Sequence, residues 1–343
     1  MKNWSKHFLA AFAAAGIQLF ALDSQTAVSS AKEAVLLCGQ AIIPSLFPMF
    51  FLCILLNGNI YANGVRPLAA LGKLFGLHST SGSLLLTCFL GGYPAGAQSL
   101  AQIYQKGHIR KNQAARLMAC CNQAGPSFIF GILGSQFQSR IAPWALWIVQ
   151  ILSTLLLWMI LGRSESWDSS ASQESRISPA EALSSAITAV VRVCGWVILF
   201  RCVIGYFNKL FLARVDVKIR ILITGLLELT NGCLLLSHID SESTRFILCS
   251  VLLTFGGTCI TFQTQSVIGD LSIKPYIAGK VLQTLISFMI AAAMSALLYR
   301  RAATLSLWLP SLIGLIIIGI YVAIEKKTVA FHGKKVYNNA RKV

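Results

Sequence analysis

Apolar residues form long runs along this chain, and short groups of glycine, proline and amide residues interrupt some of them. Four runs contain no Lys, Arg, Asp or Glu: residues 143–162, 246–269, 281–299 and 302–324. A helix needs about 20 apolar residues to cross the ~30 Å hydrocarbon layer of a bilayer. Only 12% of the chain is charged, against about 25% in soluble domains. The pattern predicts an all-α polytopic membrane protein.

The two ends and the middle of the chain differ from these runs. Residues 7–22 are apolar behind two lysines and lack a clear cleavage site, so we expect a short first span or a helix on the membrane surface. Residues 26–40 are amphipathic, and Pro44 and Pro48 open the next span, because proline is tolerated near a helix start. A serine-rich polar linker then divides the chain. The predicted regions are 1–24, 25–162, 163–178, 179–324 and a basic tail at 325–343.

Each half of the chain has two interrupted apolar segments placed between spans. Gly96 of the first half corresponds to Gly232 of the second, and Gly125 corresponds to Gly257. This order predicts two internal repeats, each with two interrupted, re-entrant or broken helices. The stretches that we expect to be non-helical and to converge near mid-membrane are residues 91–96, 122–126, 230–232 and 255–258.

Such interruptions indicate a binding site. Lipid cannot hydrogen-bond to backbone, so irregular backbone at membrane depth is tolerated only where protein buries it or where it lines a cavity. Paired broken helices in internal repeats are typical of the substrate site of secondary transporters, and helix N-termini suit anions. The alternative is that the small residues only help the helices to pack.

Polar residues and glycines at the four interruptions are the candidate ligands, because amides and hydroxyls can bind a polar solute without the full cost of a buried charge. Asn122 is the best single candidate, since its amide can donate two hydrogen bonds. The predicted substrate-binding residues are Gly92, Tyr93, Gly96, Gln98, Asn122, Gln123, Gly125, Ser127, Thr230, Asn231, Thr258 and Gln263.

Glu228 is the only acid in residues 221–236. An ionisable residue inside a span is a functional hypothesis by default. Glu228 is therefore a candidate for carrying a coupling proton or sodium ion, with Arg192 as a second charged candidate. The alternative is a structural ion pair between Glu228 and either Arg192 or Arg201.

The formal net charge of +17 does not require a nucleic-acid partner, because cytoplasmic loops of membrane proteins are enriched in Lys and Arg. We expect the N-terminus, residues 106–116 and the tail on the cytoplasmic side. The ten cysteines form no C-x-x-C pair and no zinc-like spacing, so no metal or cofactor is expected. Hydrolase and P-loop motifs are absent from the sequence, which argues against an enzyme.

The motifs of residues 40–137 resemble a known family. They combine a GYP-x-GA break at residues 92–97, a basic helix with A-x-RL at 114–117, a CNQAGP break at 121–126 and PSLFP at 44–48. This stretch is similar to the nucleoside-recognition, or Gate-domain, membrane proteins, and within them to the sporulation integral membrane proteins of the YlbJ type. Gln123 stands where the family pattern has a second Asn, which bears on ligand preference.

The resemblance implies a multi-pass inner-membrane protein of spore-forming bacteria, with the outer forespore membrane as a further location. It also implies a role in spore maturation and in moving dipicolinate, a small dianion. We therefore expect a transporter for a small polar, anionic solute. A non-transporting assembly factor and a nucleoside transporter are the alternatives.

Overall fold

The computed structural model describes residues 2–60, 82–107, 109–161 and 177–299, and within them every regular element is a helix. Five helical segments are long and apolar enough to cross a membrane: Ser24–Leu56, Ala142–Leu161, Pro179–Leu210, Glu242–Gln265 and Lys274–Tyr299. The predicted all-α polytopic class is confirmed. Most of the predicted linker, the predicted span at 302–324 and the basic tail lie outside the described residues.

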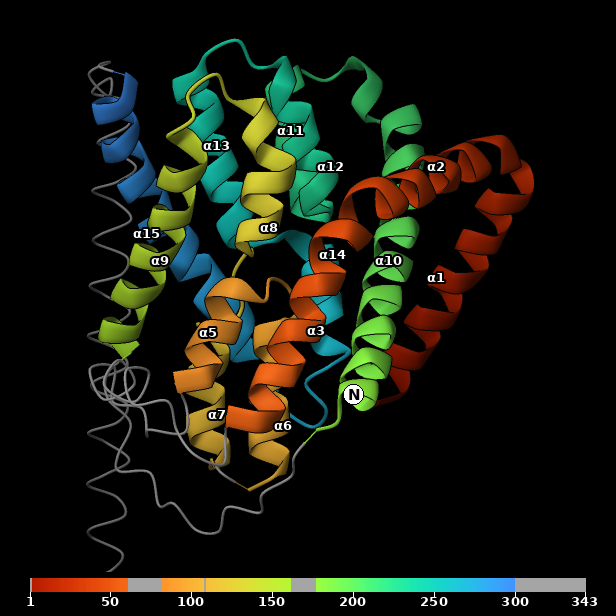
Figure 1. Ribbon diagram of the computed structural model, residues 1–343. Helices are drawn as coiled ribbons and strands as arrows, with labels where there is room; N and C mark the ends of the chain where they lie inside the picture. The colour runs from red at the N-terminus through yellow and green to blue at the C-terminus, as the bar shows by residue number, and fades with distance from the viewer. Residues whose placement is uncertain (1, 61–81, 108, 162–176, 300–343) are drawn as a thin grey trace, which may run out of the picture.

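The described helices fall into two sets that follow the predicted halves (Figure 1). The first set is α1 (Lys2–Leu22), α2 (Ser24–Leu37), α3 (Ile43–Ile60), α5 (Gly82–Leu90), α6 (Ala95–Gln105), α7 (Lys111–Met118), α8 (Pro126–Phe128) with the turns Ile129–Leu133 and Gly134–Gln136, and α9 (Ala142–Leu161). The second set is α10 (Pro179–Leu210), the turn Leu212–Arg214, α11 (Val217–Leu227), α12 (Leu229–Leu234) with the turn Leu235–His238, α13 (Glu242–Phe255), α14 (Gly257–Gln265) and α15 (Lys274–Tyr299).

The first candidate span begins earlier than predicted. A π-helical turn at Cys38–Ile42 joins α2 to α3, and Pro48 lies inside α3, so Pro44 and Pro48 do not open the span. A proline has no N–H to donate, and a wider turn can absorb the resulting gap in the hydrogen-bond ladder. α1 precedes this span as a separate helix whose apolar part is Ala13–Leu22.

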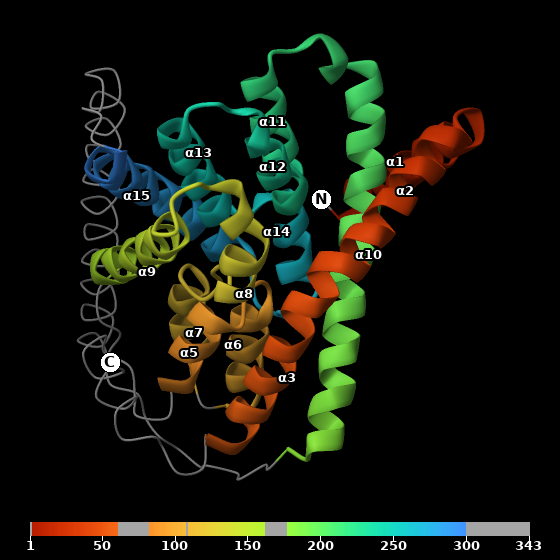
Figure 2. The ribbon, with the colours of Figure 1, turned by 45° about the horizontal axis from the view of Figure 1, so that its top comes forward.

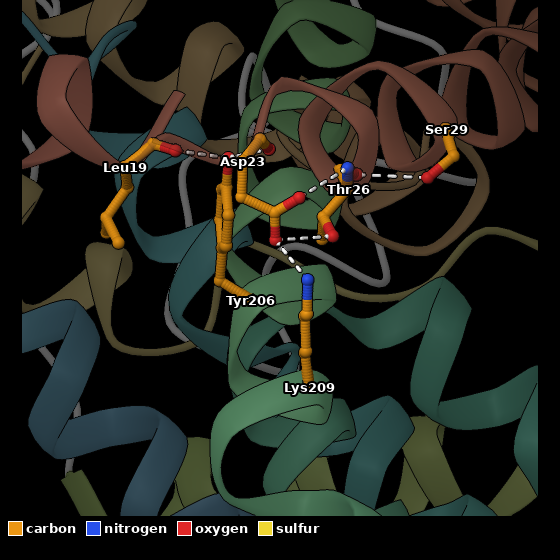
Figure 3. Close-up of polar contacts among 6 residues, drawn as sticks. All are labelled: Leu19, Asp23, Thr26, Ser29, Tyr206 and Lys209. Atoms are coloured by element: carbon orange, nitrogen blue, oxygen red, sulfur yellow. Dashed lines mark hydrogen bonds and ion pairs between the residues drawn. The ribbon is translucent and has the colours of Figure 1, made fainter. Parts of the chain in front are cut away.

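α1 and α2 meet at a corner that is bonded to α10 (Figure 3). Asp23 caps α2 by accepting hydrogen bonds from Thr26, and it also forms an ion pair with Lys209 at 2.6 Å. The Lys209 ammonium and Thr26 hold the pKa of Asp23 below its ordinary value. The Tyr206 hydroxyl lies 2.9 Å from the carbonyl oxygen of Asp23, to which it donates. These contacts fix the N-terminal corner to the C-terminal end of α10.

Two helical hairpins enter the bundle from opposite ends (Figures 1 and 2). α5 rises from the lower end in Figure 1 and α6 returns to it, whereas α11 descends from the upper end and α12 returns upward. In each hairpin the two short helices pack against each other. Both hairpins therefore turn inside the bundle.

The second half repeats the first in the opposite direction. In Figure 1, α3 runs downward, α7 and α8 run upward and α9 runs downward, while α10 runs upward, α13 and α14 run downward and α15 runs upward. Each half thus contains a long helix, a hairpin, an interrupted crossing and a second long helix. The predicted order of elements is confirmed, and the two halves are inverted with respect to each other.

Three of the four predicted interruptions are present: the first and the fourth are shorter than predicted, and the second begins earlier. Residues 91–94 and 119–125 are non-helical, and α6 begins at Ala95. The last interruption is centred on Gly256, whose φ of 82° is left-handed and suits glycine.

The prediction that residues 230–232 are non-helical is wrong. The third interruption lies at Glu228, and Thr230, Asn231 and Gly232 belong to α12. The helix restarts early because the Glu228 side chain caps it.

Two basic segments of the chain, residues 106–116 and residues 209–220, lie at opposite ends of the bundle. The turn between α6 and α7, within residues 106–116, is at the lower end of Figure 1, and the link between α10 and α11, within residues 209–220, is at the upper end. With α10 crossing the membrane, only one of these segments can be cytoplasmic. An excess of cytoplasmic positive charge therefore explains one of the clusters and not both.

Candidate functional site

A cavity lies where the two hairpins and the two interrupted crossings meet. The space between the atoms of its wall, with the open solvent at its mouth included, is about 460 Å³. The first three breaks contribute to its wall, together with α14, which follows the fourth break, and with α3 and α10. Its lining includes Gly92 and Tyr93 of the first break, Ala124 and Gly125 of the second, Glu228 and Thr230 of the third, Ile260 and Gln263 of α14, Ser45 and Leu46 of α3, and Val193 and Val197 of α10.

Glycines allow the breaks to pack closely. A Cβ on Gly125 would stand 3.1 Å from the Cα atom of Gly92, and a Cβ on Gly96 would overlap the carbonyl oxygen of Cys121. A Cβ on Gly257 would similarly stand 2.8 Å from the carbonyl oxygen of Gly225. Three of the predicted residues, Gly92, Gly96 and Gly125, thus hold backbone against backbone.

Tyr93 connects the two halves at the cavity. It is 5% exposed, and its hydroxyl donates to the carbonyl oxygen of Leu253 on α13 at 2.7 Å. Its ring faces Gly256, the centre of the fourth break. Tyr93 is therefore both a wall of the cavity and a bond between the first hairpin and the second interrupted crossing.

Asn122 is fully buried and both groups of its side-chain amide are bonded. Its oxygen accepts from the Ala97 backbone N–H at 3.1 Å, and its nitrogen donates to the Thr264 hydroxyl at 2.9 Å. Asn122 does not line the cavity. In this conformation it joins the first hairpin, the second break and α14.

Gln123 belongs to a buried polar cluster that also lies outside the cavity wall. Its amide forms a reciprocal pair with Gln283 of α15, with N···O distances of 2.8 Å and 3.2 Å. Gln283 also donates to Ser153 and Thr154 of α9. The cluster therefore connects the second break to both long helices, α9 and α15.

Lys280 lies at the centre of this cluster and was not predicted from the sequence. It is 2% exposed, and its ammonium donates to the carbonyl oxygen of Asn122 and to the side-chain oxygen of Gln283 at 3.1 Å. The predicted apolar run begins at residue 281 and leaves Lys280 out. The sequence did contain one signal: Gln283 lies one helical turn after Lys280, and the two residues together indicate a polar face on this helix.

Glu228 caps α12 and pairs with neither arginine. Its carboxylate accepts from the backbone N–H groups of Thr230 at 3.0 Å and Asn231 at 2.7 Å, and from the Asn231 side-chain amide at 2.6 Å. Arg201 instead forms an ion pair with Glu33, and Arg192 is exposed on α10. The alternative of a Glu228–arginine ion pair is therefore wrong, and Arg192 does not line the cavity.

The remaining predicted residues have separate positions. Gln98 lines a second, smaller cavity between α3 and α6, with Phe50, Cys53 and Gln102. Thr258 donates to the carbonyl oxygen of Leu226 at 2.9 Å, and Gln263 lines the main cavity. The Ser127 hydroxyl is buried and has no hydrogen-bond partner among the described residues.

All ten cysteines are buried free thiols. The described residues contain no group of three or more His, Cys, Asp or Glu side chains that could hold a metal ion. The cavity wall is mostly apolar, and the polar groups in and around it are amides, hydroxyls, backbone groups, one buried carboxylate and one buried amine.

The chain is similar to a curated protein, the sporulation integral membrane protein YlbJ of Bacillus subtilis (strain 168). The two are 25% identical over 306 residues, which cover 76% of this chain and 75% of the relative. This similarity supports the predicted resemblance to the YlbJ-type sporulation membrane proteins. The YlbJ-type resemblance of residues 40–137 therefore extends over both halves. No family model matches the chain, and no solved structure matches it.

Proposed function

We propose that this chain transports a small polar, anionic solute across a membrane of the sporulating cell, through the cavity that the two hairpins and the two interrupted crossings line. The observation that carries the proposal is that both hairpins and both interrupted crossings contribute to one cavity. Inverted repeats with broken helices around a shared site are the architecture of many secondary transporters. The similarity of this chain to the sporulation integral membrane protein YlbJ supports a role in a membrane during sporulation.

The chemistry of the surrounding residues supports an anionic solute. The nearby buried groups are rich in hydrogen-bond donors, and Lys280 supplies a cation that contacts the Tyr93 hydroxyl at 3.4 Å. The one carboxylate in the wall, Glu228, is bonded to three N–H donors. Dipicolinate, which the YlbJ-type resemblance implies, is a small dianion of suitable chemistry. We propose the inner membrane of the cell as the location, with the outer forespore membrane as a further location during sporulation.

Uptake into proteoliposomes tests the proposal. Purified protein is reconstituted, and the uptake of labelled dipicolinate and of a nucleoside is measured with and without proton and sodium gradients. We expect uptake of dipicolinate above that of protein-free liposomes. A preference for the nucleoside would mean that the substrate is a nucleoside and not dipicolinate. No uptake of either solute under any gradient would favour the alternative of a non-transporting assembly factor.

Two substitutions on α10 connect the uptake to the cavity. Val197 is buried and lines the cavity, whereas Leu199, two residues further on, is 48% exposed. Val197→Phe fills the cavity and is expected to stop uptake, and Leu199→Phe is the matched control. Equal uptake by the two variants would mean that the solute does not pass through this cavity.

A further inference from the structure

Lys280 is a buried amine whose bonded partners are all neutral. Its nitrogen donates to the Asn122 carbonyl oxygen, to Gln283 at 3.1 Å and to Gln123 at 3.5 Å, and lies 3.4 Å from the Tyr93 hydroxyl. The same nitrogen is 5.1 Å from the centroid of the Tyr93 ring, within cation–π range. In the part of the chain that the structure describes, no carboxylate is bonded to it.

A charge in this position is costly without a counter-charge. Burying an ammonium is strongly unfavourable unless it is paired and hydrogen-bonded. Amide and carbonyl oxygens satisfy its hydrogen bonds but leave its charge uncompensated. Glu228 does not compensate it, because both Glu228 oxygens are bonded to donors of Thr230 and Asn231.

The position of Lys280 relates it to the cavity. Tyr93 lies in the cavity wall, and Lys280 contacts both its hydroxyl and its ring face. The Asn122 carbonyl oxygen that Lys280 binds is two residues before Ala124, which also lines the cavity. The amine is therefore one side chain away from the space that the first and second breaks enclose.

The backbone brings the amine to this point. Gly279 packs so closely on the backbone of Ala119 that a Cβ at residue 279 would overlap it. This contact presses α15 against the end of α7, where the second break begins. An ordinary flanking lysine would extend toward the membrane surface instead, as long basic side chains do near helix ends.

We propose that Lys280 is the charge by which the cavity selects anions, and that its ammonium binds a carboxylate of the solute beside Tyr93. The proposal rests on the proposed transport function and assigns its anion selectivity to one side chain. The solute carboxylate supplies the counter-charge that the described part of the chain does not. To bind it, the Lys280 ammonium gives up one or more of its hydrogen bonds to neutral groups. A purely structural Lys280 would brace the second break without affecting which solutes are carried.

A pair of probes of nearly equal shape separates these roles. Dipicolinate carries two carboxylates, and pyridine-2,6-dicarboxamide is its neutral diamide. Uptake of both is measured in proteoliposomes for the unaltered protein, Lys280→Gln and Lys280→Arg, with Lys274→Gln as a control at the exposed start of α15. We expect Lys280→Gln to reduce dipicolinate uptake by about 10- to 150-fold, the range for a lost hydrogen bond to a charged group. The same variant should leave diamide uptake within a few fold, and Lys280→Arg and Lys274→Gln should keep the preference for the dianion.

Gln283→Glu provides a second test that keeps the lysine in place. It puts a carboxylate where the Gln283 side-chain amide now lies, with one oxygen 3.1 Å from the Lys280 nitrogen. The Ser153 and Thr154 hydroxyls now donate to the Gln150 carbonyl oxygen and accept from Gln283, and they must turn to donate to the other carboxylate oxygen. The internal counter-charge should abolish the preference for dipicolinate over the diamide. Failure of the unaltered protein to transport either probe or a nucleoside would overturn the transport function itself. Transport with an unchanged dianion-to-diamide ratio in folded Lys280→Gln or Gln283→Glu would overturn only the role of Lys280.

Discussion

The side-chain oxygen of Asn122 accepts a hydrogen bond from the backbone N–H of Ala97 at 3.1 Å. Ala97 lies in the first turn of α6, where backbone N–H groups have no partner within the helix. Asn122 therefore satisfies a donor of the first hairpin from within the second break, and the two breaks depend on each other for their conformation.

Asn122→Ala is accordingly expected to affect folding as well as uptake. It leaves the Ala97 N–H and the Thr264 hydroxyl without their partner, and each unsatisfied buried group costs about 1–3 kcal/mol. The variant should melt at a lower temperature in detergent and lose uptake. Thr264→Val removes one of the two bonds and should have a smaller effect. An unchanged melting temperature would show that the two bonds contribute little.

The contact of Gly96 with Cys121 predicts a steric effect. Gly96→Ala forces the start of α6 away from the second break, and overpacking of this kind costs about 1–3 kcal/mol. The yield of monodisperse protein by fluorescence-detected size exclusion should fall. Gly131→Ala is the matched control, because a Cβ there meets no atom within 4 Å. Equal yields from the two variants would contradict the close packing of the breaks.

Glu228 is expected to act as a helix cap. Glu228→Ala removes the acceptor for two backbone N–H groups of α12, and losing a cap costs about 0.5–2 kcal/mol. Glu228→Gln keeps one oxygen and should be less destabilised in a thermal melt. We expect the pH dependence of uptake to be unchanged in Glu228→Gln. A displaced profile would instead support the original hypothesis that Glu228 carries a coupling ion.

The two basic segments should lie on opposite sides of the membrane. Lys111→Cys and Arg214→Cys place a single reactive thiol at each end of the bundle, and the native thiols are all buried. A membrane-impermeant maleimide applied to intact cells should label only one of the two variants, and both after permeabilisation. Labelling of both in intact cells would contradict the crossing of the membrane by α10.

The spans and the approximate positions of the breaks could be predicted because both depend on local composition. Clusters of glycine and proline end helices wherever they occur. The third break was misplaced because its position depends on a specific capping bond from Glu228, which composition does not reveal.

Lys280 was missed for a different reason. Its burial requires α15 to dock closely on Ala119, and that contact joins residues distant in the sequence. The cavity-lining residues were predicted in part: Gly92, Tyr93, Gly125, Thr230 and Gln263 line it, as does Glu228. Asn122 and Gln123 support it from outside the wall.

The opposite directions of the two halves have a consequence for the conformations open to the molecule. Exchanging the packing of the α5–α6 hairpin with that of the α11–α12 hairpin would produce a second arrangement resembling the first seen from the other face of the membrane. The halves differ in sequence, so the two arrangements differ in energy. Tyr93 at one hairpin tip and Glu228 at the other are one such difference, because Tyr93 bonds to Leu253 of α13 whereas Glu228 caps α12 within its own hairpin.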